Sequence, residues 1–223
     1  TQICLADEIN RATPKTQSAM LETMQEGTVT VAGTRHVLKQ PFLVMATQNP
    51  IEQEGTYPLP EAQLDRFLFK LVVDYSTRDQ LSTIIDRTTR GEDIQPEKVM
   101  DGEEIIKWQE LVREVILAKH VQDYIVRLVL VTHPEGQYAL SITNQYIRWG
   151  ASPRGAQTIA LAAKVRALLD GRYNVSFEDV RRVYLPAMRH RIIVNFEAQA
   201  ENVESDQVLL ELLEKVPEKE EIG

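Results

Sequence analysis

The chain has 223 residues, which is enough for one large or two modest domains with a buried core. Hydrophobic residues make up 43% and charged residues 26%, and this composition excludes a disordered chain, a collagen-like fibre and a disulfide scaffold. The net charge of -8 argues against nucleic-acid binding through bulk charge. The single cysteine, Cys4, indicates a reducing cytoplasmic location, and no apolar run is long enough to span a bilayer.

The first 76 residues alternate predicted strands and helices. In chain order they are a strand at 2–6, a helix at 13–26, a hairpin at 28–38, a strand at 42–46, a short helix at 60–65 and a strand at 67–73. The hydroxyl of Thr13 followed by Pro14 marks a helix start, and Gly27 marks its end. Strands that are apolar on both faces and alternate with helices predict a parallel α/β sheet.

The remainder of the chain has a helical pattern. Helices are predicted at 77–89, at about 103–115, around 121–128, from 152 to about 168 and from 176 to 188. The polar stretch at 90–102 predicts a domain boundary, and the tail after Val216 is expected to fray.

Four polar signals fall at the ends of these elements. Asp7 and Glu8 follow an apolar strand, in the pattern by which nucleotide hydrolases hold Mg²⁺ and activate water. Asn49 follows another strand, where its amide can bond a water or a phosphate oxygen. Arg66 follows a short helix, from which it can reach a phosphate bound by a neighbouring subunit. Arg154 lies in the first turn of a helix, where a cation is unfavourable unless an anion is near.

Each signal alone has a plainer explanation. An acidic pair after a strand is commonly a solvated loop, and Asn49-Pro50 is a common turn pair. Arg66 could form an ion pair with Asp65 or Glu61, and Arg154 could be an ordinary surface arginine.

A basic run, Arg189-His190-Arg191, follows the helix predicted at 176–188. Basic side chains are favourable at a helix C-terminus, so we expect this run to complement that helix end rather than to bind a ligand.

Together the four signals resemble the AAA+ ATPases and, among them, the MoxR family. The resemblance is dense over residues 3–75 and continues more thinly through the helical part. The residues that carry it are 5–12, 41–50, Glu52, 55–67 and 151–154. It implies the C-terminal part of an AAA+ α/β core with a parallel sheet over residues 1–76, followed by an all-α lid domain over residues 77–223.

The resemblance also implies a role for each signal. Asp7 would be the Walker B ligand of Mg²⁺ and Glu8 the catalytic base, with Asn49 as the sensor 1 residue beside the attacking water. Arg66 would be the arginine finger that acts on an adjacent subunit, and Arg154 the sensor 2 residue of the lid. The implied cofactors are ATP and Mg²⁺. The implied biology is a hexameric ring that performs chaperone-like maturation or remodelling of protein complexes, with a von Willebrand factor A domain protein as a partner.

The sequence departs from the family at the phosphate-binding loop. That loop ends in Gly-Lys-Ser/Thr, and no glycine of this chain is followed by lysine. We therefore expect the loop and its strand upstream of Thr1, and we expect this chain alone not to hydrolyse ATP. The family's sheet order, 5-1-4-3-2, puts the absent strand between 42–46 and 67–73. These two segments are thus expected to leave apolar edges open and not to pair with each other.

Two other functions remain open from the sequence. The chain could be a non-catalytic interaction module whose acids and arginines form structural ion pairs. It could also belong to a DNA-remodelling AAA+ motor, because the hairpin region carries Arg35, His36 and Lys39 without an acid. The net charge and the lack of interleaved aromatic residues argue against the second function.

Overall fold

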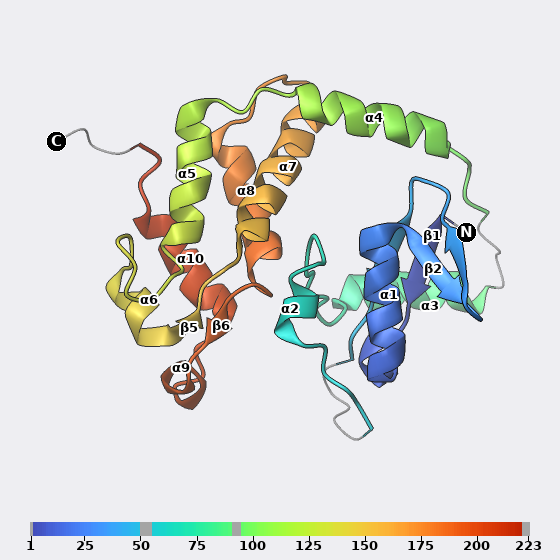
Figure 1. The fold of residues 1–223 in the computed structure, drawn as a ribbon, viewed down its shortest axis with the longest axis horizontal. Helices are drawn as coiled ribbons and strands as arrows, with labels where there is room; N and C mark the ends of the chain where they lie inside the picture. Colours follow the sequence, from blue (N-terminus) through green and yellow to red (C-terminus); the bar gives the residue numbers. More distant parts are fainter. Residues whose placement is uncertain (1, 50–54, 91–94, 220–223) are drawn as a thin grey trace.

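The computed structural model describes residues 2–49, 55–90 and 95–219. The N-terminal part of the chain, which holds the elements within residues 2–49 and 55–64, joins through α4 (Gly102–Glu114) to a helical part, which holds the elements within residues 119–215 (Figure 1). The first elements are β1 (Ile3–Ala6), the 3-10 helix η1 (Ile9–Arg11), α1 (Pro14–Glu26), β2 (Thr28–Val31), β3 (Thr34–Val37), β4 (Leu43–Ala46) and α2 (Glu61–Leu64). The later elements are α3 (Arg78–Thr89), α4 (Gly102–Glu114), α5 (Lys119–Leu130), α6 (Ser141–Tyr146), β5 (Ile147–Trp149), α7 (Pro153–Leu169), α8 (Phe177–Met188), β6 (Ile193–Val194), α9 (Phe196–Ala200) and α10 (Ser205–Lys215).

β1 and β4 form the parallel pair that the sequence predicts at 2–6 and 42–46. Alternate side chains of a strand point to opposite faces of a sheet. The register therefore gathers four large apolar residues on one face, each between 49% and 60% exposed. These residues are Ile3, Leu5, Leu43 and Met45.

The other face of the pair packs toward α1. Ala6 and Ala46 contact a small buried cluster made of Ile9, Leu21 and Leu59. This cluster unites the two strands, the helix and the loop before α2 into the N-terminal part.

α1 begins and ends at the residues that the sequence predicts. The Thr13 hydroxyl accepts a hydrogen bond from the Thr16 amide (3.4 Å), and Pro14 occupies the first turn. Gly27 ends the helix with φ 61°, a left-handed conformation that glycine adopts without steric penalty.

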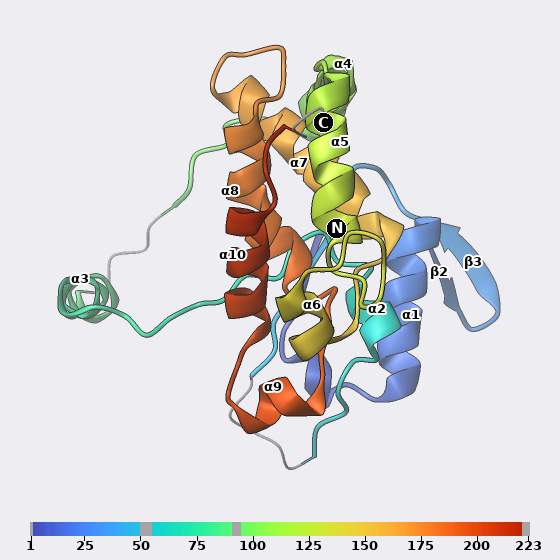
Figure 2. The ribbon, with the colours of Figure 1, turned by 90° about the vertical axis from the view of Figure 1, so that its left-hand side faces the viewer.

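The predicted hairpin is also present, as the antiparallel pair β2–β3. Its two turn residues, Ala32 and Gly33, have φ of 49° and 82°, and positive φ at both positions matches the right-handed twist of the strands. The side chains of β3 are exposed, and the hairpin projects from the N-terminal part (Figure 2).

The prediction of a strand at 67–73 is wrong. Among the described strands, β4 pairs with β1, and none pairs with this segment. The segment bonds to the helical part instead: the Lys70 amide donates to the Pro186 carbonyl (3.0 Å). An apolar run becomes a strand only where a neighbouring strand supplies backbone partners. The expectation that 42–46 and 67–73 do not pair with each other is met.

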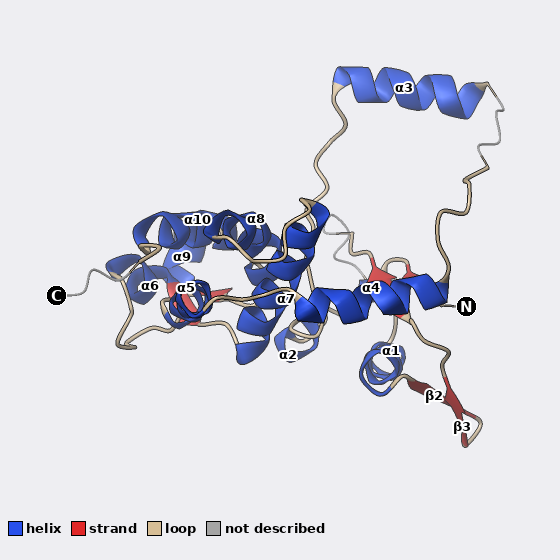
Figure 3. Cartoon of the chain, turned by 90° about the horizontal axis from the view of Figure 1, so that it is seen from above, coloured by secondary structure: helices blue, strands red, loops and turns tan. Residues whose placement is uncertain are grey.

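α3 stands apart from the other helices (Figure 3). It is bounded by a capping box, in which the Thr77 hydroxyl accepts from the Gln80 amide (3.4 Å) and the Gln80 side chain accepts from the Thr77 amide (2.8 Å). None of its residues is buried. α3 is therefore defined by its capping residues and not by packing against other elements.

The helical part holds the larger core, in which α7 packs along α8 and α5 (Figure 1). The sequence predicts α4, α5, α7 and α8, but it does not reveal α6, α9, α10 or the short antiparallel pair β5–β6. α10 buries Val208, Leu209 and Leu212 in this core. None of the described helices has the length and apolarity needed to cross a bilayer.

Candidate functional site

Asp7 and Glu8 lie where β1 ends, beside the end of β4. The Thr47 hydroxyl donates to Asp7 Oδ1 (2.6 Å) and accepts from the Glu8 amide (2.8 Å). The Thr47 amide donates to the Ala6 carbonyl (3.1 Å), and the Thr47 carbonyl accepts from the Ile9 amide (3.0 Å). Thr47 thus fixes the acidic pair at the carboxyl ends of both strands, where α/β folds present ligands.

Glu8 has a left-handed backbone, with φ 48° and ψ 52°. This conformation is uncommon for a residue with a side chain and is held here by the bond to Thr47. The Glu8 carboxylate forms an ion pair with Arg11 (Nε–Oε2 3.1 Å). Because both side chains are partly exposed, the pair is weak, and Glu8 can leave Arg11 at a small free-energy cost.

Asn49 is tied to the loop that follows the acidic pair by a network of hydrogen bonds. The Asn10 side chain donates to the Asn49 carbonyl (3.4 Å), and the Asn10 carbonyl accepts from the Tyr57 amide (2.6 Å). The buried Gln17 of α1 donates to the carbonyls of Ile9 (3.1 Å) and Tyr57 (2.8 Å). These bonds tie the loop after β1 to the loop after β4. Pro50 and Glu52, which contribute to the resemblance, lie outside the described residues.

Arg66 lies just after α2 and extends toward α1. Its Nη1 donates to Oε1 of Gln25 in the last turn of α1. Its Nε is buried without a hydrogen-bond partner among the described residues. Asp65, which the sequence offered as a partner for Arg66, instead binds Arg154 and Arg191.

Arg154 lies at the start of α7 and contacts the same carboxylate. Its Nη1 is 3.1 Å from Asp65 Oδ2. The Ser152 hydroxyl lies 2.8 and 2.9 Å from the two Asp65 oxygens, and Arg191 Nε lies 3.1 Å from Oδ1. Asp65 and Arg191 are 14% and 2% exposed, whereas Arg154 is 47% exposed. The anion that the position of Arg154 suggested is thus a carboxylate of this chain.

Asp65 and His190, two titratable groups on which the charge of Arg191 acts, have shifted pKa values. Burial acts to raise the pKa of Asp65, but hydrogen bonds from Ser152 and Arg154 and the charge of Arg191 lower it overall. Burial, aided by the charge of Arg191, lowers the pKa of His190 to about 4. At pH 7, Asp65 is therefore ionised and His190 is neutral.

The five residues proposed from the sequence thus fall into three groups. Asp7, Glu8 and Asn49 gather at the ends of β1 and β4. Arg66 is attached to α1, and Arg154 is attached to Asp65. In this conformation the two arginines bond to other residues of the chain rather than to the acidic pair.

The sequence does not reveal the contact between Asp65 and Arg191. It indicates Asp65 only as a partner for its neighbour Arg66, and Arg191 only as a complement to a helix end. Arg191 does donate to the Ala187 carbonyl near the C-terminus of α8, which confirms that part of the expectation. Its ion pair with Asp65 joins residues 126 positions apart, so no local pattern indicates it.

The acidic pair suits a magnesium ion bound together with a nucleotide. Mg²⁺ in such sites usually takes one or two carboxylates and completes its shell with phosphate oxygens and water. Asp7 and Glu8 supply two carboxylates at one end of the sheet. Within the described residues, no group of three or more His, Cys, Asp or Glu side chains is arranged to hold a metal. A Mg²⁺ at this place therefore depends on phosphate oxygens for the rest of its ligands.

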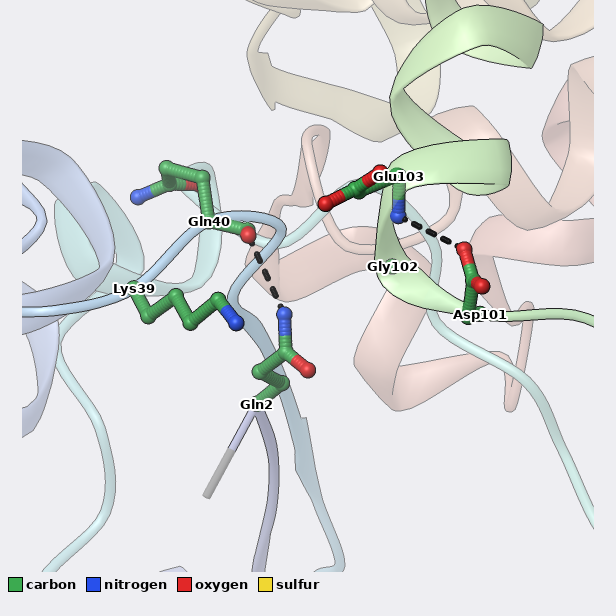
Figure 4. Close-up of a pocket in the computed structure, with 6 residues that line it drawn as sticks. All are labelled: Gln2, Lys39, Gln40, Asp101, Gly102 and Glu103. Carbon is green, nitrogen blue, oxygen red and sulfur yellow. Dashed lines mark hydrogen bonds between the residues drawn. The ribbon is translucent and has the colours of Figure 1, made fainter.

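A pocket of about 320 Å³ lies at the opposite end of the strands (Figure 4). It is lined by Gln2, Lys39, Gln40, Asp101, Gly102 and Glu103. Gln2 and Gln40 precede β1 and β4, so the pocket is at the amino ends of these strands. It contains none of the five residues proposed from the sequence for the nucleotide site.

Comparisons with known proteins identify the family and the fold. Residues 1–69 match the ATPase family associated with various cellular activities (AAA), and residues 139–212 match the AAA lid domain. The chain is 40% identical over 212 residues to Chaperone MoxR1 of Mycobacterium tuberculosis and 41% identical over 217 residues to YeaC of Bacillus subtilis. It matches the crystal structure of a "putative ATPase" from Cytophaga hutchinsonii with a TM-score of 0.91 and 39% identity.

These alignments cover 95%, 96% and 97% of this chain. The chain spans 56% of the Mycobacterium protein, 64% of the Bacillus protein and 66% of the Cytophaga chain. The two matched segments have the order of the observed architecture, a partial parallel sheet followed by a helical lid. The chain therefore belongs to the AAA+ ATPase family and, within it, to the MoxR group.

Proposed function

We propose that this chain carries the hydrolytic end of an ATP site in a longer MoxR-type protein. The observation that supports this most is the bridge made by Thr47, which holds the Asp7 carboxylate and the Glu8 backbone at the joined ends of two parallel strands. ATP bound there would present its phosphates to Asp7, Glu8 and Asn49. We further propose residues 1–76 as part of the core and residues 77–223 as the lid domain.

Asp7 and Glu8 have different tasks in this proposal. Asp7 serves as the protein ligand of Mg²⁺, oriented by the hydroxyl of Thr47. When bound, Mg²⁺ neutralises charge that develops on the phosphate oxygens. Glu8 leaves Arg11 and accepts a proton from the attacking water, while the Asn49 amide orients that water.

Substitution of Glu8 tests this assignment. In the full-length protein, Glu8→Gln keeps the shape of the side chain but removes the proton acceptor, so we expect ATP to bind and remain unhydrolysed. The measurements are nucleotide retention and phosphate release. Arg11→Gln is the matched control, because it removes the partner of Glu8 and should leave hydrolysis intact. Rapid hydrolysis by Glu8→Gln would exclude Glu8 as the base.

Arg66 is proposed to act on the nucleotide of an adjacent subunit in a ring. An arginine supplied in trans contributes about 10³–10⁵ in rate in related phosphoryl transfer. We expect Arg66→Ala in the full-length protein to abolish hydrolysis and to preserve nucleotide binding. A variant that loses binding but keeps a normal chemical step would contradict the role. Arg154 is proposed to contact the γ-phosphate from the lid after leaving Asp65.

The 223-residue chain alone is proposed to be inactive. It has no Gly-Lys pair with which to cradle the phosphates. We expect no phosphate release from ATP by the purified chain, and activity only when the residues upstream of Thr1 include such a loop. Turnover by the chain alone would refute this proposal.

The wider role that we propose is chaperone-like maturation or remodelling of protein complexes in the cytoplasm. The ring would be hexameric, with a von Willebrand factor A domain protein as a partner. Support comes from the relative named Chaperone MoxR1. If the full-length protein bound a partner equally well with Asp7→Asn and without nucleotide, it would instead act as a non-catalytic interaction module. Salt-dependent DNA binding through the hairpin would instead favour a DNA-remodelling motor.

A further inference from the structure

We propose that Asp65 is a positioning residue that couples Arg154 of the lid to its own neighbour Arg66. A movement of the helical part would then move both arginines together. The inference rests on the roles given above to Arg66 and Arg154, but the coupling itself can be measured without ATP hydrolysis.

The Asp65 carboxylate is held by donors of the helical part. Ser152, Arg154 and Arg191 all bond to it, at distances between 2.8 and 3.1 Å. Arg191 is almost completely buried and Arg154 is about half exposed. The bond to Arg191 is therefore the fixed contact, and the bond to Arg154 is the one that an incoming phosphate can replace.

Arg191 also holds the backbone on both sides of Arg66. Its Nη2 donates to the carbonyls of Asp65 (3.2 Å) and Phe67 (2.7 Å), and its Nη1 donates to the carbonyl of Leu68 (3.1 Å). The side chain of Arg66 extends toward Gln25 of α1. One buried guanidinium of the lid thus fixes the peptide groups that set the direction of Arg66.

The neighbouring aromatic residues show that this segment lies between the two parts. Phe67 packs against the cluster formed by Ile9, Leu21 and Leu59, whereas Phe69 packs against the core of the helical part. The segment 65–69 therefore cannot follow one part without changing its contacts with the other. A ligand shifts such an equilibrium only through different contacts in the two states, and the exchange of Asp65 for phosphate at Arg154 provides that difference.

The first test uses the 223-residue chain and arginine side-chain NMR. Asp65→Asn removes the charge with little change in shape, and we expect the Nε–Hε resonances of Arg154 and Arg66 both to shift. Asp86→Asn is the matched control, because it breaks an exposed aspartate–arginine pair in α3 (Asp86–Arg90, 3.1 Å) and should move neither resonance. Shifts at Arg154 and Arg191 with an unchanged Arg66 would overturn the coupling.

A second variant decides the question if Asp65→Asn does not fold. Ser152→Ala removes one donor but keeps both charges of the Asp65–Arg191 pair, so we expect smaller shifts at the same two arginines. An unchanged Arg66 in a folded Ser152→Ala variant whose Arg154 resonance moves would again overturn the proposal.

The third test measures ATP hydrolysis by the full-length protein. A displacement of about 1 Å in a catalytic group can lower the rate about 100-fold. We expect Asp65→Asn to lower kcat by about that factor with KM for ATP changed by less than about threefold, and Asp65→Glu to recover part of the loss. A raised KM with normal kcat would contradict the coupling to Arg66. An inactive wild-type protein would instead refute the proposed function, and the NMR test would still decide the coupling.

Discussion

Arg191 offers a quantitative test of how the two parts are held together. Its side chain is 2% exposed, and its guanidinium pairs with Asp65. It also donates to carbonyl groups before and after Arg66 and to the Thr158 hydroxyl (3.2 Å). Arg191→Met keeps most of the side-chain volume and removes the charge and all of these donors.

The expected loss of stability follows from the burial of this pair. Breaking a buried ion pair by removing one partner costs about 3–5 kcal/mol in the free energy of unfolding. Asp65 retains Ser152 and Arg154 in the variant, so we expect the lower end, about 3 kcal/mol. For a chain of this length that corresponds to a fall in Tm of roughly 6–12 °C. Arg90→Met breaks an exposed pair with Asp86 and should cost about 0.3–0.5 kcal/mol.

Urea unfolding followed by circular dichroism measures both variants under the same conditions. A double variant, Asp65→Leu with Arg191→Met, removes both charges of the pair and should be more stable than Arg191→Met alone, because the carboxylate that has lost its buried partner is gone. If Arg191→Met lowered the free energy of unfolding by less than about 1 kcal/mol, the cost of desolvating Asp65 and Arg191 would cancel the attraction between them. The Asp65–Arg191 pair would then not be what holds the two parts together.

Two further predictions concern the pH dependence of the free energy of unfolding. His190, whose pKa is about 4 in the folded chain, stays neutral while the unfolded chain takes up a proton below about pH 6.5. Stability therefore falls as the pH is lowered from about 6.5 to 4, by about 3 kcal/mol, and His190→Gln should remove this slope in a urea series. Burial acts to raise the pKa of Asp179, but hydrogen bonds from Arg172 and Ser176 lower it to about 2. Ionised Asp179 therefore stabilises the folded chain by about 2 kcal/mol. This stabilisation is fully present above about pH 4 and is lost as the pH falls toward 2. Asp179→Asn should be less stable at pH 7 and nearly insensitive to pH in that range; an unchanged acid transition would contradict the assignment.

Local signals in the sequence were sufficient for much of the fold. Thr13, Gly27 and Thr77 mark helix ends by side-chain or backbone chemistry that acts within a few residues. Gly33 favours the hairpin turn because it adopts the positive φ of 82° without steric penalty. Such features could be predicted because their partners lie nearby in the chain.

Features that depend on distant partners could not be predicted in this way. The run at 67–73 has the composition of a strand, but its backbone bonds to residues more than 110 positions later. Asp65 meets Arg154 and Arg191 across 89 and 126 positions. The acidic pair was identified because it follows a strand, whereas Thr47, which holds it, required knowledge of the β1–β4 register.

The open face of the β1–β4 sheet provides a last prediction, in which adjacent residues serve as test and control. Met45 lies on this face and is half exposed, whereas its neighbour Val44 lies on the other face and is buried. Met45→Lys should change the free energy of unfolding by no more than about 0.5 kcal/mol and should reduce concentration-dependent association in sedimentation, because large exposed apolar patches drive association. Val44→Lys buries an unpaired charge and should prevent folding. If Met45→Lys also unfolds the chain, the face is covered in solution. If residues outside this chain cover it in the longer protein, the same substitution there should cost several kcal/mol while remaining harmless here.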